Sequence, residues 1–474
     1  MNIRDVIGRI NFIGGQQAIM KEARRLLVGT AAVGRKGGGQ LADRIKGMMA
    51  IEAQMNSELE AWAEPEDLQD GSRFDVCDLR IWLQLAAEAG VPHVPGKVIL
   101  SVGEAGLEAL LRPIQIPEDV SARVARQMDK AIAGDAELAR IRETSEPEEA
   151  IDPSLVREIR EAMTSSMEEI PPSWMVRTHL CGSSNLKALV GTGLMLKGDD
   201  VAEVAEGVKL GAGWVQVGNR QMIDFQDHRF IELAARGHKP VTHYIARPWE
   251  QPARFHEGED IHRANSPLAG PGKWPAEWRV FIRNGQVTGV ANYYGWTGAG
   301  ATPENAWNAL EAAALGQKLA DHAAGRGLVG VFMDQQFLRT RAGHDPEVAS
   351  ALAPWAEDQL QATIDFIETA EGLKLLEGGP PHAPGGGAHP CAFAGQGVVR
   401  GDVTRMVALC EGAAFLPMEH AHLGEPKTWV DGDAAGRILD WPAVIELAVR
   451  HAPPSAEAEA WTSKIMNTEP AMEP

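Results

Sequence analysis

Residues 276–294 constrain the fold of this chain most strongly. The segments Ala276–Arg283 (AEWRVFIR) and Gln286–Tyr294 (QVTGVANYY) have strand-like composition and are joined by Asn284-Gly285. An Asn-Gly pair between two such segments is a strong β-hairpin signal, because both residues of the turn must adopt positive φ. Side chains alternate across a strand, so one face carries Glu277, Arg279 and Phe281 and the other Trp278, Val280 and Ile282. The face with Glu277 and Arg279 is either a structural ion pair or part of a polar cleft.

Helices and further short strands surround this hairpin. A helix is predicted to start at Thr302, with Pro303 in its first turn, and to end at Gly325. A second helix is expected over about 354–370, because Leu360, Ile364 and Ile367 have helical spacing. Upstream of the hairpin, a helix is expected over 200–210. Short strands are predicted over 174–178, 193–196, 213–217 and 240–249. The predicted fold class is therefore α+β.

Two carboxylates follow short apolar runs that are typical of buried strands. Asp334 lies in 330–338 (GVFMDQQFL) and Glu377 in 374–382 (KLLEGGPPH). If these strands pair, the two carboxylates lie side by side and repel each other unless a cation separates them. Mg²⁺ held by one or two carboxylates and by phosphate is the usual solution. The alternative is that both are strand-end carboxylates that pair with nearby arginines.

A second candidate for phosphate binding is the loop 179–192 (HLCGSSNLKALVGT), between the strands 174–178 and 193–196. Arg177 and Lys187 supply positive charge, and the loop around Ser183 and Ser184 offers backbone N–H groups to phosphate oxygens. The alternative is an ordinary surface hairpin, since Gly and Ser cluster in turns for local reasons.

The glycine-rich segment 29–39 (GTAAVGRKGGG) is not a phosphate loop of the Walker A type. That motif needs Lys and then Ser or Thr after its second glycine, whereas Arg35 and Lys36 stand there. We interpret the segment as a flexible basic linker.

Length and charge indicate a protein of several domains with small-molecule or basic partners. The 474 residues carry a net charge of −20, which argues against a nucleic-acid-binding surface. Four scattered cysteines suit a reducing compartment. The first fifteen residues have no apolar run of signal-peptide length, and no stretch is long enough to span a membrane. We expect a cytoplasmic protein without membrane partners.

The order of these parts resembles the ATP-grasp superfamily over roughly residues 165–420. WMVRT and its serine-containing loop are similar to the family's glycine-loop hairpin, and Val241–Ile245 to its hinge strand. EWRVFIRNGQVTGV resembles the substrate-domain hairpin. The resemblance implies two α+β subdomains around a nucleotide cleft, 165–245 as the lid and 246–420 as the C-terminal subdomain. Outside the resemblance, apolar spacing predicts that residues 1–150 are mostly helical, and a helical segment is expected over 421–452. The composition of 453–474, rich in Pro, Ala and Glu, predicts a disordered tail.

The resemblance also assigns roles to individual residues. It implies ATP and Mg²⁺ as cofactors, with Asp334 and Glu377 as the metal-binding acids. Arg177, Lys187, Ser183 and Ser184 are placed on the phosphates, and the backbone of His243, Tyr244 and Ile245 reads adenine. Arg279 reaches phosphate or substrate, so Arg279 and Lys187 are the expected catalytic residues. The alternative for Arg279 is a simple ion pair with Glu277 or Glu250.

One departure from the family opens three functional alternatives. The superfamily commonly has Glu-x-Asn at the second acid, whereas this chain has Glu377-Gly378-Gly379. The phrases NYYGW, LLEGGPPH and AHPCAF look like a divergent branch found in bacteriophage genomes. The resemblance implies an ATP-dependent carboxylate–amine ligase that forms an acyl phosphate. One alternative is a structural protein that has lost catalysis and is incorporated in a phage particle, where its N-terminal helices associate with each other or with phage proteins. The other alternative is a small-molecule kinase.

Overall fold

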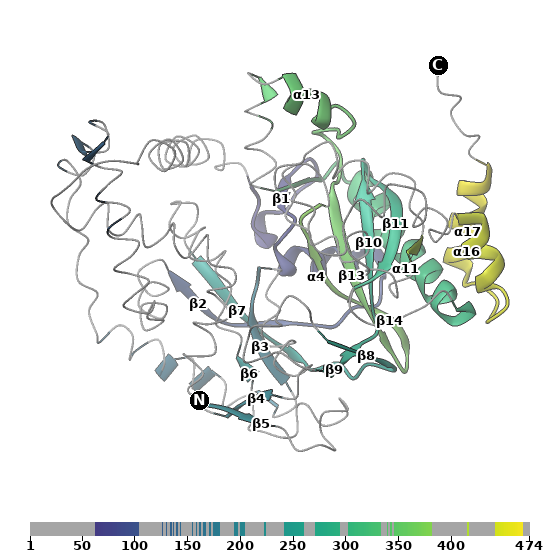
Figure 1. The fold of residues 1–474 in the computed structure, drawn as a ribbon, viewed down its shortest axis with the longest axis horizontal. Helices are drawn as coiled ribbons and strands as arrows, with labels where there is room; N and C mark the ends of the chain where they lie inside the picture. Colours follow the sequence, from purple (N-terminus) through teal and green to yellow (C-terminus); the bar gives the residue numbers. More distant parts are fainter. Residues whose placement is uncertain are drawn as a thin grey trace.

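The computed structural model describes the chain in separate stretches (Figure 1). These are 62–103, 170–171, 174–180, 194–197, 200–203, 222–223, 241–259, 271–293, 302–332, 346–381, 415–416 and 441–467, with single positions between 126 and 166 and at 339, 342 and 343. Within them the fold is mixed α+β and contains several small sheets, which confirms the predicted class.

The largest sheet has five strands in the order β14-β13-β10-β11-β15. Its strands are β10 (Glu277–Arg283), β11 (Gln286–Asn292), β13 (Ala362–Thr369), β14 (Gly372–Gly379) and β15 (Phe415–Leu416). The predicted hairpin is confirmed as β10–β11, and its turn residues Asn284 and Gly285 have φ of 52° and 69°. The Asn284 side chain accepts hydrogen bonds from Ala356 N and Gln361 Nε2, so the turn is also tied to the chain before β13.

Helix α11 (Pro303–Gly325) packs on one face of this sheet. The Thr302 hydroxyl accepts from Asn305 N and Pro303 occupies the first turn, as predicted. The helix ends at Gly325, also as predicted; Arg326 is its cap, and Gly327 with φ of 63° follows. Gly316 lets the helix approach closely, because a Cβ there would lie 2.8 Å from Val280 Cγ1.

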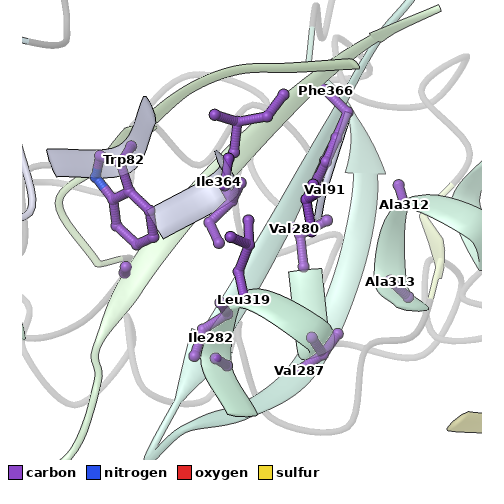
Figure 2. Close-up of a cluster of buried hydrophobic side chains, with 14 of the residues drawn as sticks. Trp82, Val91, Val280, Ile282, Val287, Ala312, Ala313, Leu319, Ile364 and Phe366 are labelled. Atoms are coloured by element: carbon purple, nitrogen blue, oxygen red, sulfur yellow. The ribbon is translucent and has the colours of Figure 1, made fainter. Parts of the chain in front are cut away.

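The same face of the sheet holds the main hydrophobic core (Figure 2). Val280 and Ile282 of β10, Ile364 and Phe366 of β13 and the alanine face of α11 meet there. Helix α4 (Leu79–Ala89) adds Trp82, which lies edge-on to Phe74 with ring centroids 5.8 Å apart. The tryptophan indole also donates to Val76 O at 2.7 Å, which fixes its ring in the core.

A four-stranded sheet in the order β2-β7-β3-β6 lies beside the first. Its strands are β2 (Lys97–Gly103), β3 (Trp174–Thr178), β6 (Met222–Ile223) and β7 (Val241–Pro248). Two further pairs are β4 (Leu194–Lys197) with β5 (Asp200–Glu203) and β8 (Phe255–Glu259) with β9 (Pro271–Pro275).

Residues 62–103 belong to this assembly and do not form a separate helical unit. They contain a 3₁₀ turn η2 (Pro65–Asp67), α4, and the strands β1 (Arg73–Asp75) and β2. β2 pairs with β7, and β1 pairs in parallel with β12 (Val329–Val331). The prediction of a mostly helical region is thus wrong for 62–103, while most of the remainder of 1–150 lies outside the described residues.

Four predictions on secondary structure and pairing are wrong. The stretch 354–370 holds β13 instead of a helix, because Ala362, Ile364 and Phe366 alternate toward the core. Residues 200–203 form β5 and not the start of a helix. Strand β12 pairs with β1, while β14 pairs with β13, so the strands leading to Asp334 and Glu377 are not partners in the described sheets. Likewise β3 pairs with β6 and β7, and β4 with β5, instead of the predicted hairpin.

The C-terminal helices cover α11 on the side away from the sheet (Figure 1). They are α16 (Trp441–Ala448) and α17 (Ala456–Asn467), and a short α13 (Pro346–Leu352) lies earlier in the chain. Trp441 and Trp461 stack edge to face with centroids 4.6 Å apart. The segment predicted as a disordered tail is therefore helical over 456–467, since burial of Ala458 and Trp461 compensates for its polar composition. Among the residues described, no helix is long and apolar enough to cross a membrane.

Candidate functional site

The face of the five-stranded sheet opposite the core carries a row of buried charges. Register places Arg279 of β10 opposite Asp365 of β13, and Asp365 opposite Glu377 of β14. All three side chains are at most 7% exposed. Buried charges are normally paired with each other or bound to a ligand, so this row of side chains is the candidate functional site.

Arg279 and Asp365 form a bidentate ion pair. The guanidinium donates from Nε to Oδ1 at 2.8 Å and from Nη2 to Oδ2 at 2.7 Å. Its planar face lies over the Tyr293 ring, 4.4 Å from the centroid. Asp365 is therefore a bidentate partner of Arg279 that the sequence-based alternatives, Glu277 and Glu250, did not include.

Arg177 connects the second sheet to this row. It lies on β3, and its Nη1 donates to Glu377 Oε2 at 2.6 Å, with both side chains 5% exposed. A second donor, Nη2, reaches Leu180 O at 3.2 Å. The predicted phosphate-binding arginine and the predicted metal-binding glutamate thus contact each other directly.

The junction of the two sheets is built from backbone as well as side chains. Val94 N donates to Leu375 O, and Leu375 N donates to Pro92 O, so residues 92–94 line the outer edge of β14. From β7, Arg247 donates to Leu376 O and to Val94 O, each at 2.7 Å. Glu377 is therefore anchored from several sides.

The remaining predicted site residues divide into two groups. Asp334, Lys187, Ser183 and Ser184 lie outside the described residues. His243, Tyr244 and Ile245 lie on β7, which has β2 on one side and β3 on the other. His243 O accepts from His179 N, and the ladders occupy both edges of the strand. The expected adenine contact needs a free strand edge, and residues 243–245 do not provide one.

Sequence reasoning missed Asp365. It lies in ATIDFIET, which also fits a helix because Leu360, Ile364 and Ile367 have helical spacing. Two signals favoured a strand: Thr and Ile are β-branched, and Ala362, Ile364 and Phe366 alternate with Thr363 and Asp365. With the strand assigned, Asp365 falls on the face opposite Ala362, Ile364 and Phe366, which is the polar face of the sheet.

The carboxylates of Asp365 and Glu377 provide oxygen ligands of the type and number that proteins commonly use for Mg²⁺. Mg²⁺ takes oxygen ligands and is often held by one or two carboxylates together with substrate phosphates. Among the described residues no group of three or more His, Cys, Asp or Glu could hold a metal by itself. A cation held by Asp365 and Glu377 would need further oxygen ligands, which phosphate could supply. The neighbouring guanidinium groups suit the phosphates themselves.

A separate polar cluster lies where α4 meets β3 and β7. His179 Nδ1 accepts from His243 N at 3.2 Å, and the two rings meet edge to face at 5.1 Å. Burial lowers the pKa of His179 well below its ordinary value, and the nearby Arg80 and His243 act in the same direction. Burial also lowers the pKa of His243, which shares a 2.8 Å hydrogen bond with Ser101. Both imidazoles are thus held neutral.

Comparison with known proteins adds no relative. No family model matches the chain, and neither a curated protein nor a solved structure is significantly similar to it.

Proposed function

We propose that this protein is an ATP-grasp-type enzyme that uses Mg-ATP to join a carboxylate to an amine. One observation carries the proposal: Asp365 and Glu377 stand opposite each other, and each is held by a buried arginine. Two carboxylates and two guanidinium groups at one sheet junction match the charge of a magnesium–phosphate group. The resemblance of the chain order to the ATP-grasp superfamily supports the same proposal.

The metal pair in this proposal is Asp365 and Glu377, in place of the sequence-based pair Asp334 and Glu377. When bound, Mg²⁺ would neutralise phosphate charge and orient the transferred phosphoryl group. Arg177 and Arg279 already point at the two carboxylates. With phosphate present they would donate to its oxygens and stabilise charge that develops during transfer.

The proposed reaction needs no side-chain nucleophile. The substrate carboxylate attacks the γ-phosphorus, ADP leaves, and the amine then displaces phosphate from the acyl phosphate. Positioning and charge stabilisation account for most catalysis of phosphoryl transfer. In this proposal Arg279, whose Cζ lies over the Tyr293 ring, would bind the transferred group or the substrate carboxylate. A kinase of the same fold would stop after the first step, and product analysis separates the two.

A second candidate is a module that keeps the fold without catalysis. The observation in its favour is that both carboxylates are already neutralised by arginine. Gly379 also lacks the amide found in Glu-x-Asn. Such a module would serve as a structural or phage-particle component.

Calorimetric titration with Mg²⁺ and a non-hydrolysable ATP analogue tests the proposal. We expect the wild type to bind, and Asp365→Asn and Glu377→Gln to bind about 10-fold or more weakly, as for other lost metal-site partners. Glu371→Gln is the control, because this exposed residue pairs with Lys374 at the β13–β14 turn. Absence of wild-type binding would favour the structural module. Unchanged affinity in both site variants would place the nucleotide elsewhere.

A further inference from the structure

The β13–β14 pair contains a bulge at the residue before Glu377. Phe366 of β13 pairs with Leu375 of β14. The residue before Phe366, Asp365, pairs with Glu377, which is two residues after Leu375. Leu376 is therefore an extra residue with no partner on β13. A bulge of this kind changes which face the following side chains occupy, and bulges are frequent beside active sites.

The bulge decides on which face Glu377 lies. In an unbroken ladder, Asp365 would face Leu376, and Glu377 would face Ile364 on the apolar side of the sheet. That side is the core, where a Cβ at Gly378 would lie 2.1 Å from the Trp82 ring. The extra residue moves Glu377 to the charged face and brings Gly378 against Trp82.

Arg247 occupies the position where the bulge interrupts the edge of β14. Its side chain is 1% exposed, and its fork spans two carbonyl groups, Leu376 O and Val94 O. Residues 92–94 pair with Leu375 but not with the bulged Leu376 beyond it. The guanidinium thus replaces the ladder hydrogen bonds that the bulge removes, and arginine suits this because its donors form a rigid fork.

We propose that Arg247 is a positioning residue that holds the Leu376 bulge and thereby keeps the Glu377 carboxylate on the charged face beside Asp365 and Arg177. Its effect on ligand binding rests on the proposed function, but its effect on strand register does not. The two arginines act on consecutive residues, because Arg177 contacts Glu377 directly and Arg247 fixes the carbonyl of Leu376.

The register is measured with a disulfide that leaves the charged residues in place. Thr363 pairs with Gly379 beyond the bulge, and a Cβ at 379 would lie 3.4 Å from Thr363 Oγ1. Cysteines at both positions are within reach of a disulfide. We expect Thr363→Cys/Gly379→Cys to crosslink in the otherwise wild-type chain and to lose most of its crosslinking with Arg247→Met. The product is identified by peptide mapping.

Two controls separate positioning from general destabilisation. Arg254→Met removes an arginine that binds Glu304 and also Glu368, which lies at the end of β13 away from Thr363, and we expect full crosslinking there. Deletion of Leu376 removes the extra residue, so crosslinking should no longer depend on Arg247. Circular dichroism confirms folding, and Arg247→Lys, which keeps a donor, replaces the methionine variant if the latter does not fold.

Ligand affinity is the second measurement. We expect Arg247→Met to weaken binding of Mg²⁺ with the ATP analogue about 10- to 100-fold, while Arg254→Met binds as wild type. Wild-type crosslinking in a folded Arg247→Met protein would overturn the inference. If the wild type binds no nucleotide, the proposed function fails, and the crosslinking experiment still decides the role of Arg247.

Discussion

Asp365 and Glu377 face each other on neighbouring antiparallel strands, and each carboxylate is held by an arginine from another strand. Arg279 comes from the same sheet, whereas Arg177 crosses from the second sheet. The two carboxylates lie in the middle of the row, with one arginine at each end. Each buried carboxylate is thereby paired with a guanidinium group. Under the proposed function, the same four side chains would bind a metal ion and its phosphate ligands.

The Arg177–Glu377 pair should couple strongly in a double-mutant cycle. Either Arg177→Met or Glu377→Leu leaves one buried charge unpaired, which typically costs about 3–5 kcal/mol of unfolding free energy. The double variant should cost far less than the sum, because it buries no charge. Urea unfolding measures all three. The exposed pair Arg450–Glu446 is the control and should contribute about 0.3–0.5 kcal/mol. Additive costs at 177 and 377 would mean that the pair does not form.

The two glycines after Glu377 should respond differently to alanine. A Cβ at Gly378 would lie 2.1 Å from Trp82, whose indole is fixed by its hydrogen bond to Val76 O. Gly378→Ala should therefore cost about 3 kcal/mol or prevent folding. At Gly379 the nearest atom is Thr363 Oγ1 at 3.4 Å, so Gly379→Ala should cost about 1 kcal/mol or less. Equal stability of the two variants would show that Trp82 does not pack on Gly378.

The C-terminal helix should contribute to global stability. Trp461 is 6% exposed and stacks on Trp441, so Trp461→Ala should cost about 3–5 kcal/mol. Thermal unfolding of this variant and of Met466→Ala measures the difference, since Met466 is 57% exposed and should tolerate the change. An unfolding midpoint unchanged by Trp461→Ala would restore the interpretation of 453–474 as an independent tail.

Stability should fall as the pH is lowered through the ordinary titration range of histidine. The folded-state pKa of His179 is depressed, so below about pH 6.5 the unfolded chain binds a proton that the folded chain does not. The unfolding free energy then decreases by at most ~1.4 kcal/mol per pH unit for this site until the folded-state pKa is reached. Above that range the site contributes no pH dependence.

His179→Asn should reduce this slope, because asparagine keeps an acceptor for His243 N and does not titrate. His243 remains and retains its own contribution, since its pKa is also lowered. Urea unfolding at several pH values between 5 and 8 gives the slope. A slope in His179→Asn equal to that of the wild type would contradict the assignment of His179 as a buried neutral imidazole.

Local signals predicted those parts of the fold that local interactions determine. The Asn284-Gly285 turn needs positive φ, and Thr302 and Pro303 start α11, so both elements were readable from a few residues. Arg177 and Glu377 were both identified as functional candidates, although nothing in the sequence indicated that they contact each other. That contact joins residues far apart in the chain, and no local pattern encodes it.

The errors arose where tertiary packing decided between two local interpretations. The stretch 362–369 satisfies helical and alternating spacing alike, and the core formed by Ile364 and Phe366 selects the strand. This error concealed Asp365. The bulge at Leu376 is equally invisible in sequence, because the side chains that contact it and the following Gly378, Arg247 and Trp82, come from other elements.

The most direct test of the proposed site is the position of a bound metal. We would determine a crystal structure with Mn²⁺ in place of Mg²⁺ and with a non-hydrolysable ATP analogue, and locate the ion by anomalous scattering. The account predicts a peak between the carboxylates of Asp365 and Glu377, with Arg177 and Arg279 turned toward the phosphates. An anomalous peak beside Asp334 with no contact to Asp365 would contradict the account. Nucleotide bound away from the junction of the two sheets would also contradict it.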